Sequence, residues 1–302
     1  MRWLSDEVVA RLRRTADRPD LSGTRYTIRE EIGRGGMGTV YLADDAVLDR
    51  PVALKVLDGE PAQAEDLDLL LREARVMAGL EHPGLVPIHD AGVLPDGRVF
   101  YAMKRVEGSR LDEFAATAPT LSDRLAVFRK ICETVAFAHA RGVVHRDLKP
   151  GNVMIGPFGE VLVLDWGVAR RSEDPAEPGG TVLGTRAYMA PEQAEGRNDR
   201  VDARADVYSL GVLLEELLGK DRERALAAVA ARARSPRPED RYARVEELSS
   251  DVRRFLDGQA PLAYRETAFE RARRFFRRHR TAILLIAAYL VMRAAILLFY
   301  GR

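Results

Sequence analysis

The run Val144-His145-Arg146-Asp147-Leu148-Lys149-Pro150-Gly151-Asn152-Val153-Met154 carries the strongest structural signal in this 302-residue chain. Asp165-Trp166-Gly167 begins eleven residues after the run ends, and Ala190-Pro191-Glu192 follows further on. Upstream of the run, a glycine-rich segment begins at Gly33, and Val52-Ala53-Leu54-Lys55 comes after it. The order and spacing of these segments say more than any one of them alone.

The glycine-rich segment Gly33-Arg34-Gly35-Gly36-Met37-Gly38 contains the pattern G-x-G-x-x-G. Its glycines let backbone N–H groups approach phosphate oxygens closely, and the same spacing also serves dinucleotide-binding folds. A dinucleotide site needs a helix directly after the glycines, but Thr39-Val40-Tyr41-Leu42 is typical of a strand. The segment therefore predicts a hairpin folded over a nucleotide. A glycine-rich turn without a ligand stays open for this motif taken alone.

Lys55 lies within an expected strand of apolar residues. An unpaired buried ammonium is costly, so such a lysine needs an anionic partner. ATP phosphate and the carboxylate of Glu73, on the following expected helix, would supply it. An exposed lysine on an edge strand is the alternative interpretation.

Strand-like runs come first in the chain, and helical periodicity dominates later. The expected strands cover residues 26–32, 39–44, 52–57, 85–93 and 99–106. The expected helices cover residues 67–78, 121–141, 207–218 and 225–234. This order suggests one sheet-rich lobe and one helix-rich lobe.

The run from Val144 to Met154 matches the protein-kinase catalytic loop, H-R-D-L-x-x-x-N, at every specified position. Together with the other segments, residues 26–258 resemble the bacterial eukaryotic-like (Hanks-type) serine/threonine protein kinases. The resemblance implies an α+β, bilobal fold, with a small sheet-rich N-lobe carrying one helix over residues 26–106. A larger helical C-lobe is expected over residues 107–258. ATP and Mg²⁺ are the implied cofactors.

The resemblance also implies roles for the loop residues. Phosphoryl transfer needs positioning and charge neutralisation more than covalent chemistry. Asp147 would accept or orient the proton of the substrate hydroxyl, and Lys149 would meet the transferred phosphate. Asn152 and Asp165 would hold the magnesium ions that bridge the phosphates.

The nucleotide site is implied in the same way. Lys55 would contact the α- and β-phosphates, braced by Glu73, and Met103 would guard the back of the adenine pocket. The implied nucleotide-binding residues are Ile32, Gly33, Arg34, Gly35, Gly36, Met37, Gly38, Val40, Ala53, Lys55, Met103, Val106 and Met154.

Serine/threonine specificity is implied by Lys149 and by Gly184-Thr185. Arg146 beside the catalytic aspartate resembles the arrangement in which a basic pocket receives a phosphorylated activation loop. That loop would run from residue 165 to residue 192. Thr181 is the first candidate phosphosite, followed by Thr185 and Ser172, and an unmodified loop hydroxyl is the alternative at Thr181.

Two departures from the family pattern stand out. Trp166 replaces the usual phenylalanine, which keeps an aromatic plug beside the metal ligand but could change the balance between active and inactive forms. After the helix expected at 207–218, the chain passes almost directly into the helix at 225–234, so the C-lobe is expected to be trimmed there. Arg241 would pair with Glu192.

Charge is unevenly distributed along the chain. The formal net charge is +1, but residues 265–302 hold nine arginines and two glutamates, giving +7 and leaving −6 for residues 1–264. A mildly acidic body supplies no basic face, which argues against nucleic acid as a partner. The single cysteine, Cys132, excludes an intramolecular disulfide and a cysteine-based zinc site.

The C-terminal segment is expected to anchor the chain in a membrane. Residues 281–300 are uncharged except for Arg293, and 20 helical residues rise about 30 Å, the thickness of a bilayer core. Arg293 costs about 2.5–3.5 kcal/mol on insertion scales, while ten Leu, Ile, Val and Phe residues return about 3–6 kcal/mol. The basic run Arg271–Arg280 should remain cytoplasmic and suits anionic lipid. A helix packed on the kinase or on another subunit is the alternative.

The expected organisation is an N-terminal amphipathic extension (1–25), a kinase domain (26–258), a basic juxtamembrane linker (259–280) and a transmembrane helix (281–300). We expect a serine/threonine protein kinase that autophosphorylates its activation loop, modifies proteins and faces the cytoplasm from a bacterial inner membrane. Homodimerisation through the tail is a further expectation.

Two other functions are considered. A membrane-anchored pseudokinase would bind nucleotide or a partner without transferring phosphate, but the residues whose loss usually marks one, Lys55, Asp147, Asn152 and Asp165, are all present. A small-molecule kinase is disfavoured by the Ala-Pro-Glu motif and the long activation segment.

Overall fold

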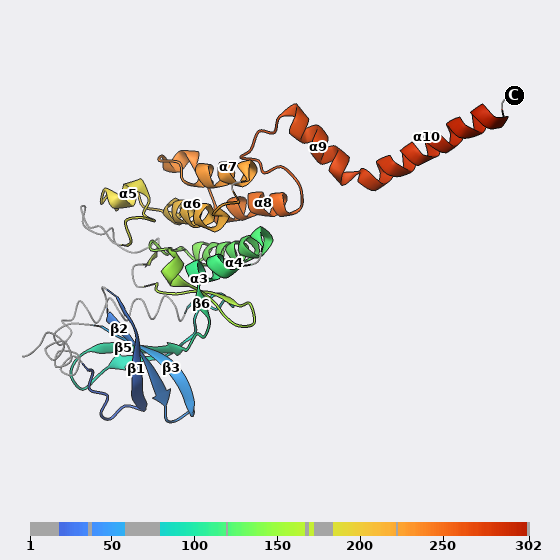
Figure 1. The fold of residues 1–302 in the computed structure, drawn as a ribbon. Helices are drawn as coiled ribbons and strands as arrows, with labels where there is room; N and C mark the ends of the chain where they lie inside the picture. Colours follow the sequence, from blue (N-terminus) through green and yellow to red (C-terminus); the bar gives the residue numbers. More distant parts are fainter. Residues whose placement is uncertain are drawn as a thin grey trace, which may run out of the picture.

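The chain folds into two lobes followed by a projecting helical tail (Figure 1). The computed structural model describes residues 18–35, 38–57, 79–118, 120–166, 169–171, 184–221 and 223–300. Two expectations lie outside these residues: most of the amphipathic extension at 1–25, and the helix at 67–78 that carries Glu73.

The N-lobe is a five-stranded antiparallel sheet with the strand order β1-β2-β3-β5-β4. Its strands are β1 (Tyr26–Gly35), β2 (Gly38–Asp45), β3 (Arg50–Val56), β4 (Ile88–Val93) and β5 (Val99–Lys104). Along β3, Val52, Leu54 and Val56 enter one hydrophobic cluster of this lobe. Because side chains alternate along a strand, Ala53 and Lys55 belong to the opposite face of the sheet.

The expected strands of this lobe all form, with boundaries that shift by up to three residues. The strand expected from Leu85 begins three residues later, at Ile88. Leu85 instead forms an isolated parallel bridge with Val163 of the C-lobe, and the N–H of Val163 donates to the carbonyl oxygen of Gly84 at 2.8 Å. The chain before β4 therefore belongs to the junction of the two lobes, which local alternation does not reveal.

The C-lobe is built around helices with a large hydrophobic core between them. Its helices are α3 (Leu111–Thr117), α4 (Leu121–His139), α5 (Pro191–Ala194), α6 (Ala203–Leu218), α7 (Arg224–Ala233) and α8 (Val245–Leu256). Helix α4 begins with a capping box in which Thr120 and Asp123 satisfy each other's backbone N–H groups. Only residues 219–223 separate α6 from α7, as expected for a trimmed lobe.

Short strands beside these helices position the functional loop. Strands β6 (Ser109–Arg110), β8 (Val153–Ile155) and β9 (Val161–Val163) form one small sheet, and β7 (Val143–Val144) pairs with β10 (Arg170–Arg171). Residues 145–152 connect β7 to β8 and so lie at the junction of the two sheets.

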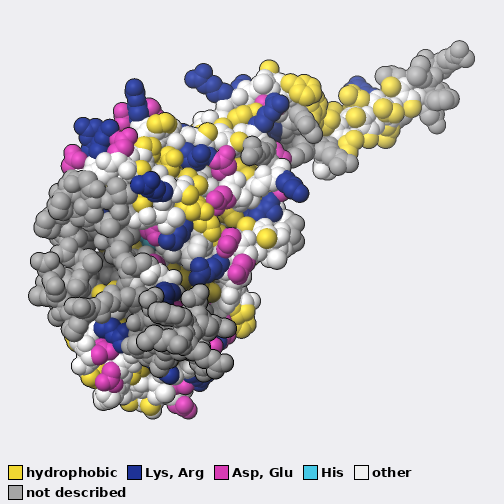
Figure 2. All heavy atoms as spheres, turned by 60° about the vertical axis from the view of Figure 1, so that its left-hand side comes forward, with side chains coloured by type: hydrophobic (Ala, Val, Ile, Leu, Met, Phe, Trp, Pro, Cys, Tyr) yellow, Lys and Arg dark blue, Asp and Glu magenta, His cyan; other side chains and the backbone are white. Residues whose placement is uncertain are grey.

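The tail consists of α9 (Ala268–Arg278) and α10 (Arg280–Tyr300), and it leaves the C-lobe beside α7 and α8, at the end away from the N-lobe (Figure 1). Large apolar side chains of α10 are exposed, including Leu285 at 67% and Val291 at 70%, and they cover the projecting tail in Figure 2. Over the described residues, none of the helices combines the length and apolar character that a membrane crossing requires. The span expected at residues 281–300 therefore stays a prediction.

Candidate active site

Asp206 of α6 fixes the backbone of the loop between β7 and β8. Its carboxylate is fully buried and accepts the backbone N–H groups of His145 and Arg146, each at 2.8 Å. The ring Nε2 of His139 lies 2.7 Å from the same carboxylate. Burial acts to raise the pKa of Asp206, but the hydrogen bond and charge of His139 outweigh it, so the pKa is lowered. The loop is thus held by an ionised carboxylate inside the core.

Two residues beside the loop adopt left-handed backbone conformations that are uncommon outside glycine. Arg146 has φ of 70° and Asp165 has φ of 56°. Such conformations persist where surrounding contacts over-determine them, and they cluster at functional sites. Two hydrogen bonds supply those contacts at Arg146. Its N–H donates to Asp206, and its carbonyl oxygen accepts from Gln193 Nε2 at 2.7 Å.

Asp147 is the centre of a converging set of donors. Its Oδ2 accepts from Lys149 Nζ at 2.6 Å and from Asn152 Nδ2 at 3.2 Å, and its Oδ1 accepts the backbone N–H of Thr185 at 2.7 Å. Lys149 Nζ also donates to Thr185 Oγ1 at 2.8 Å. The structure therefore brings together the predicted catalytic residues Asp147 and Lys149, the predicted metal ligand Asn152, and Thr185.

Lys55 reaches across from the N-lobe to Asp165. Its Nζ lies 2.8 Å from Asp165 Oδ1, and its side chain is 8% exposed while that of Asp165 is 46% exposed. Burial acts to raise the pKa of Asp165, but the adjacent Lys55 ammonium outweighs it and lowers that pKa. Lys55 is therefore buried beside an anionic partner, as predicted, but that partner is Asp165, whereas the expected partner Glu73 lies outside the described residues.

The glycine-rich segment forms a hairpin between β1 and β2, as predicted, with Gly35 opposite Gly38. Gly38 has φ of 152°, and a Cβ there would lie 2.4 Å from the carbonyl oxygen of Val56, so only glycine fits. Gly36 and Met37 lie outside the described residues.

The other predicted nucleotide-binding residues lie on the strands around this hairpin and on β8. Val40 of β2 pairs with Lys55, and Ala53 of β3 pairs with Met103 of β5. Three more belong to separate elements: Ile32 lies in β1, Val106 just after β5, and Met154 in β8. Gly33 and Arg34 also belong to β1, where they pair with Val40 and Thr39.

Trp166 fills a buried position next to the metal-binding candidate Asp165. It is 1% exposed, its Nε1–H donates to the carbonyl oxygen of Val163 at 3.3 Å, and its ring centroid lies 4.4 Å from that of His145. The predicted aromatic plug is therefore present, and the larger indole gains a hydrogen bond that phenylalanine cannot make.

Glu192 and Arg241 form the predicted ion pair. Arg241 Nη1 and Nη2 donate to the two carboxylate oxygens of Glu192 at 2.7 and 2.8 Å, and both side chains are almost fully buried. Arg241 also donates to three backbone carbonyls, including that of Arg204 at 3.0 Å. The pair joins the end of the activation segment to the loop between α7 and α8.

The residues expected to hold Mg²⁺ fit that ion. Asn152 donates through Nδ2 and so leaves its Oδ1 as an acceptor, while Asp165 keeps its Oδ2 beside the oxygen that meets Lys55. Mg²⁺ prefers oxygen ligands and takes several of them from water and phosphates. Within the described residues, no group of three or more His, Cys, Asp or Glu side chains could hold a metal alone, so nucleotide phosphates would complete the shell.

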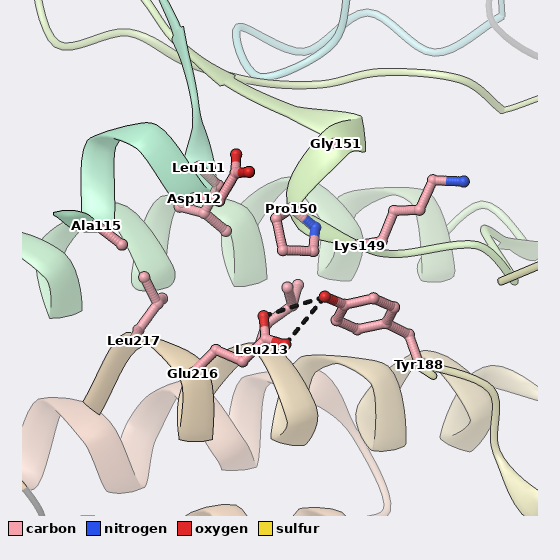
Figure 3. A pocket seen from close by; sticks show the side chains of 10 residues that line it. All are labelled: Leu111, Asp112, Ala115, Lys149, Pro150, Gly151, Tyr188, Leu213, Glu216 and Leu217. Carbon is pink, nitrogen blue, oxygen red and sulfur yellow. Dashed lines mark hydrogen bonds between the residues drawn. The ribbon is translucent and has the colours of Figure 1, made fainter. Parts of the chain in front are cut away.

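A hollow of about 460 Å³ lies beside Lys149 and Gly151, between α3 and α6 (Figure 3). Leu111 and Leu213 give it apolar walls, and the hydroxyl of Tyr188 donates to Glu216 at 2.9 Å at its edge. Burial, reinforced by that bond, raises the pKa of Tyr188 to about 12, so the phenol stays protonated.

Sequence reasoning missed three of these features: the buried anchor Asp206, the contact of Thr185 with Lys149, and the Tyr188–Glu216 pair. A carboxylate in the first turn of an otherwise apolar helix was the available signal for Asp206, because a buried charge needs partners. The other two contacts join segments 36 and 28 residues apart, which no local pattern indicates.

Comparison with known proteins agrees with this geometry. The family described as "Protein kinase domain" matches residues 26–259. "Serine/threonine-protein kinase PknD" of Chlamydia felis is 35% identical over 294 residues, which cover 78% of this chain and 31% of that protein. "Serine/threonine-protein kinase PknB" of Mycolicibacterium smegmatis is 35% identical over 281 residues, covering 80% of this chain and 45% of that protein.

A solved structure shows the same fold. The kinase domain of PknI from Mycobacterium tuberculosis superimposes with a TM-score of 0.60 at 27% identity, covering 76% of this chain and 95% of that one. The chain spans less than half the length of the two curated relatives it matches. By its sequence match and its bilobal structure, the chain belongs to the protein kinase domain family.

Proposed function

We propose that the chain is a serine/threonine protein kinase that transfers the γ-phosphate of ATP to protein hydroxyls. The observation that carries the proposal is the convergence of Lys149, Asn152 and Thr185 on the carboxylate of Asp147. The Lys55–Asp165 pair, which joins the two lobes, supplies the groups that phosphates and metal require. The names of PknD and PknB, both serine/threonine-protein kinases, support the same activity.

In this proposal each residue performs a distinct step. Asp147 accepts or orients the proton of the attacking hydroxyl, and Lys149, 2.6 Å away, neutralises charge on the transferred phosphoryl group. Asn152 and Asp165 would hold Mg²⁺, while Lys55 would hold the α- and β-phosphates. Bound Mg-ATP supplies the phosphoryl group and the positive charge between its phosphates. Asp206 positions the catalytic loop through the backbone of His145 and Arg146, and such positioning contributes to catalysis.

Protein substrates would occupy the hollow beside Lys149. Lys149, Pro150 and Gly151 of the catalytic loop line it, so an entering segment would lie against that loop (Figure 3). The carboxylates of Asp112 and Glu216 at its edge favour substrate segments that carry a basic side chain. Phosphorylation of paired peptides with and without an arginine near the acceptor tests this preference, and equal rates would exclude it.

Autophosphorylation of the activation loop is part of the proposal. Thr181 and Ser172 lie outside the described residues. Thr185 meets Lys149 through its hydroxyl, so a phosphate there would displace a catalytic contact. Thr181 therefore stays the first candidate, with Arg146 as the cation expected to receive its phosphate.

We further propose that the tail tethers the kinase to a bacterial inner membrane, with the kinase on the cytoplasmic side. Helix α10 exposes apolar side chains on all sides, such as Leu284, Leu285, Ile286 and Tyr289. A helix that is hydrophobic all round requires an apolar environment. The arginines at 271–280 suit anionic lipid. Arg293 within this segment favours a partner helix, so homodimerisation belongs to the same proposal.

The decisive experiment follows γ-phosphate transfer by the full chain in lipid nanodiscs with Mg-ATP. Asp147→Asn preserves volume but removes the proton acceptor, whereas Asp257→Asn changes an exposed carboxylate at the end of α8 and serves as the matched control. Phosphate should appear on serine or threonine with the unmodified chain and with Asp257→Asn, but not with Asp147→Asn. ATP binding without transfer to itself or to generic protein substrates would overturn the proposal and favour a pseudokinase.

A further inference from the structure

The linker that follows α8 is held by a buried carboxylate of the C-lobe. Asp251 is 1% exposed and accepts the backbone N–H groups of Leu262 at 2.6 Å and Ala263 at 3.0 Å. It also accepts the hydroxyl of the buried Tyr242 at 2.9 Å. Three donors converge on one carboxylate, so the chain is fixed where it leaves the kinase body. We call this contact the Asp251 clamp.

Further contacts extend the clamp along the linker. Arg254 donates through Nε to the carbonyl oxygen of Ala260 at 2.8 Å. Pro261 is buried, and Ala263 packs against the hydrophobic core of the C-lobe. Residues 260–263 therefore belong to the body rather than to a loose tether.

The first turn of α9 is joined to this clamped linker. Thr267 and Glu270 form a capping box, with the N–H of Thr267 donating to Glu270 Oε2 at 2.9 Å and the N–H of Glu270 donating to Thr267 Oγ1 at 3.2 Å. Tyr264 donates its hydroxyl to the same glutamate at 2.8 Å, and Glu266 pairs with Arg274 at 2.6 Å. These contacts hold the start of α9 to residues 264–267, which directly follow the clamped residues 260–263, and so favour one direction for the tail.

Helix α9 has two chemically different sides. Phe269 is 78% exposed and Phe276 is 60% exposed, and residues seven apart share one side of a helix. Ala272 lies on the same side, while Arg271 and Arg274 fall on the opposite one. Residues 271–280 contain six arginines and no acidic residue. Exposed aromatic residues on one side and arginines on the other are typical of a helix that lies in a membrane interface.

We propose that α9 lies flat on an anionic lipid surface, with Phe269 and Phe276 inserted at the acyl boundary and its arginines at the headgroup phosphates. Through the Asp251 clamp, this contact holds the C-lobe in one orientation, with α7 and α8 toward the membrane and the N-lobe away from it (Figure 1). The inference rests on the membrane attachment in the proposed function. Two observations favour lipid as the partner of α9. Its arginines complement the charge of anionic headgroups, and α10, the next helix in the chain, exposes an apolar surface (Figure 2).

Site-directed spin labels on the full chain in vesicles test the proposal. Cys132 is fully buried, so a single introduced cysteine is the one that reacts. The test positions are Phe269→Cys and Phe276→Cys. Leu290→Cys in α10 reports membrane attachment, and Phe158→Cys, at a body phenylalanine that is 94% exposed, is the matched aqueous control.

Accessibility of each label to oxygen and to a water-soluble nickel chelate is compared in neutral phosphatidylcholine vesicles and in vesicles that also contain phosphatidylglycerol. Labels at 269 and 276 should be protected from nickel in the anionic vesicles and much less so in the neutral ones. The label at 290 should be protected in both, and the label at 158 in neither.

The possible failures separate from one another. If 290 is protected but 269 and 276 stay as accessible as 158 in anionic vesicles, the α9 inference is wrong while membrane attachment stands. If 290 is also accessible, the attachment itself is wrong and the inference falls with it. If 269 and 276 are protected equally in both lipids and two labelled copies show a short label–label distance, a second copy covers α9 and the lipid proposal is overturned.

A distance measurement between two spin labels tests whether the Asp251 clamp orients the tail. Leu262 is 74% exposed, so Leu262→Pro removes its N–H donor with little loss of packing, and Leu262→Ala keeps the donor as the matched control. Distances between labels at 158 and 269 should form one narrow distribution in the unmodified background and in Leu262→Ala, and a broad one in Leu262→Pro. Equal widths in all three would show that the clamp does not orient the tail.

Discussion

The catalytic loop and the tail satisfy their side chains in opposite ways. Around the loop, buried charges such as Asp206 and Glu192 find their partners inside the chain, at 2.7–2.8 Å. Along α10, apolar side chains such as Leu285 and Val291 remain at least two-thirds exposed. One region is complete by itself, whereas the other requires something that the chain alone does not supply.

This difference follows from what each kind of group loses on leaving water. A buried charge without a partner is strongly unfavourable, so a catalytic loop built on charges must be closed by internal bonds. An exposed apolar helix gains free energy only when another apolar phase covers it. The loop can therefore be tested by removing its partners, and the tail by changing its surroundings or its single internal charge.

The largest effect is expected from breaking a buried pair. Arg241→Met leaves the Glu192 carboxylate buried without its partner, and such changes typically cost about 3–5 kcal/mol in the free energy of unfolding. Urea denaturation, followed by the fluorescence of buried Trp166, measures it.

Arg234→Met is the matched control, because Arg234 pairs with Glu215 in a partly exposed position. Exposed pairs contribute about 0–1 kcal/mol, so this variant should unfold almost like the parent. Equal losses in the two variants would show that burial of the Glu192–Arg241 pair has no special weight.

The next effect concerns the tail. Arg293→Leu removes a charge that costs about 2.5–3.5 kcal/mol at the centre of a membrane helix and adds a favourable leucine, so insertion should improve by about 3–4 kcal/mol. A glycosylation-based insertion assay on residues 281–300 measures the shift. Arg271→Leu, outside the segment, should leave insertion of the segment nearly unchanged. An unchanged value for Arg293→Leu would mean that this residue does not enter the bilayer core.

The sequence predicts some features of the site and the fold, but it does not predict contacts between distant segments of the chain. The hairpin at Gly35–Gly38 and the buried Lys55 could be predicted from residue patterns with a specific chemical use, whereas the Glu192–Arg241 pair was implied by the family resemblance. The family resemblance extended this reasoning to Asp147 and Asn152. The division into a sheet-rich and a helix-rich lobe followed from periodicity, whereas the strand order β1-β2-β3-β5-β4 was not predicted.

Other features could not be predicted, because their partners are far apart in the chain. Asp206 accepts backbone N–H groups that lie 60 and 61 residues away in the chain, and no local sequence pattern indicates these partners. Thr185 was predicted as a candidate phosphosite, a role that stays a prediction, yet its contact with Lys149 was not foreseen. Leu85 was expected within a strand of the N-lobe but bridges to the C-lobe instead.

A smaller effect is expected at Trp166, where the chain departs from its family. Trp166→Phe loses the hydrogen bond to the carbonyl of Val163 and part of a buried ring, which together cost about 1–2 kcal/mol of unfolding free energy. Phosphoryl transfer should persist, because the aromatic plug remains. Trp166→Leu removes the ring stacking on His145 as well and should cost more. A Trp166→Phe chain as stable as the parent would show that the indole adds nothing to the packing.

The smallest effect is a dependence on pH, because Asp165 is only half buried and solvent screens its pair with Lys55. The pKa of Asp165 in the folded chain is lowered from its ordinary value of 3.8, so the pair stabilises the fold above that pH and ceases to do so as the pH falls through the lowered pKa. In Lys55→Met, burial acts without the ammonium, so the carboxyl takes up a proton at higher pH. The stability difference between parent and Lys55→Met should therefore shrink as the pH falls toward and below 3.8, as urea denaturation at several pH values would show.

The double-mutant cycle isolates this titration from everything else that Lys55 does. Asp165→Asn cannot titrate, so adding Lys55→Met to it should change the stability by the same amount at each pH. If the difference between parent and Lys55→Met is also independent of pH, the two groups do not interact electrostatically in the folded chain. Lys55 and Asp165 would then lack a charge interaction of the kind that holds the catalytic loop together, and Lys55 would have to be assigned to phosphate contact alone.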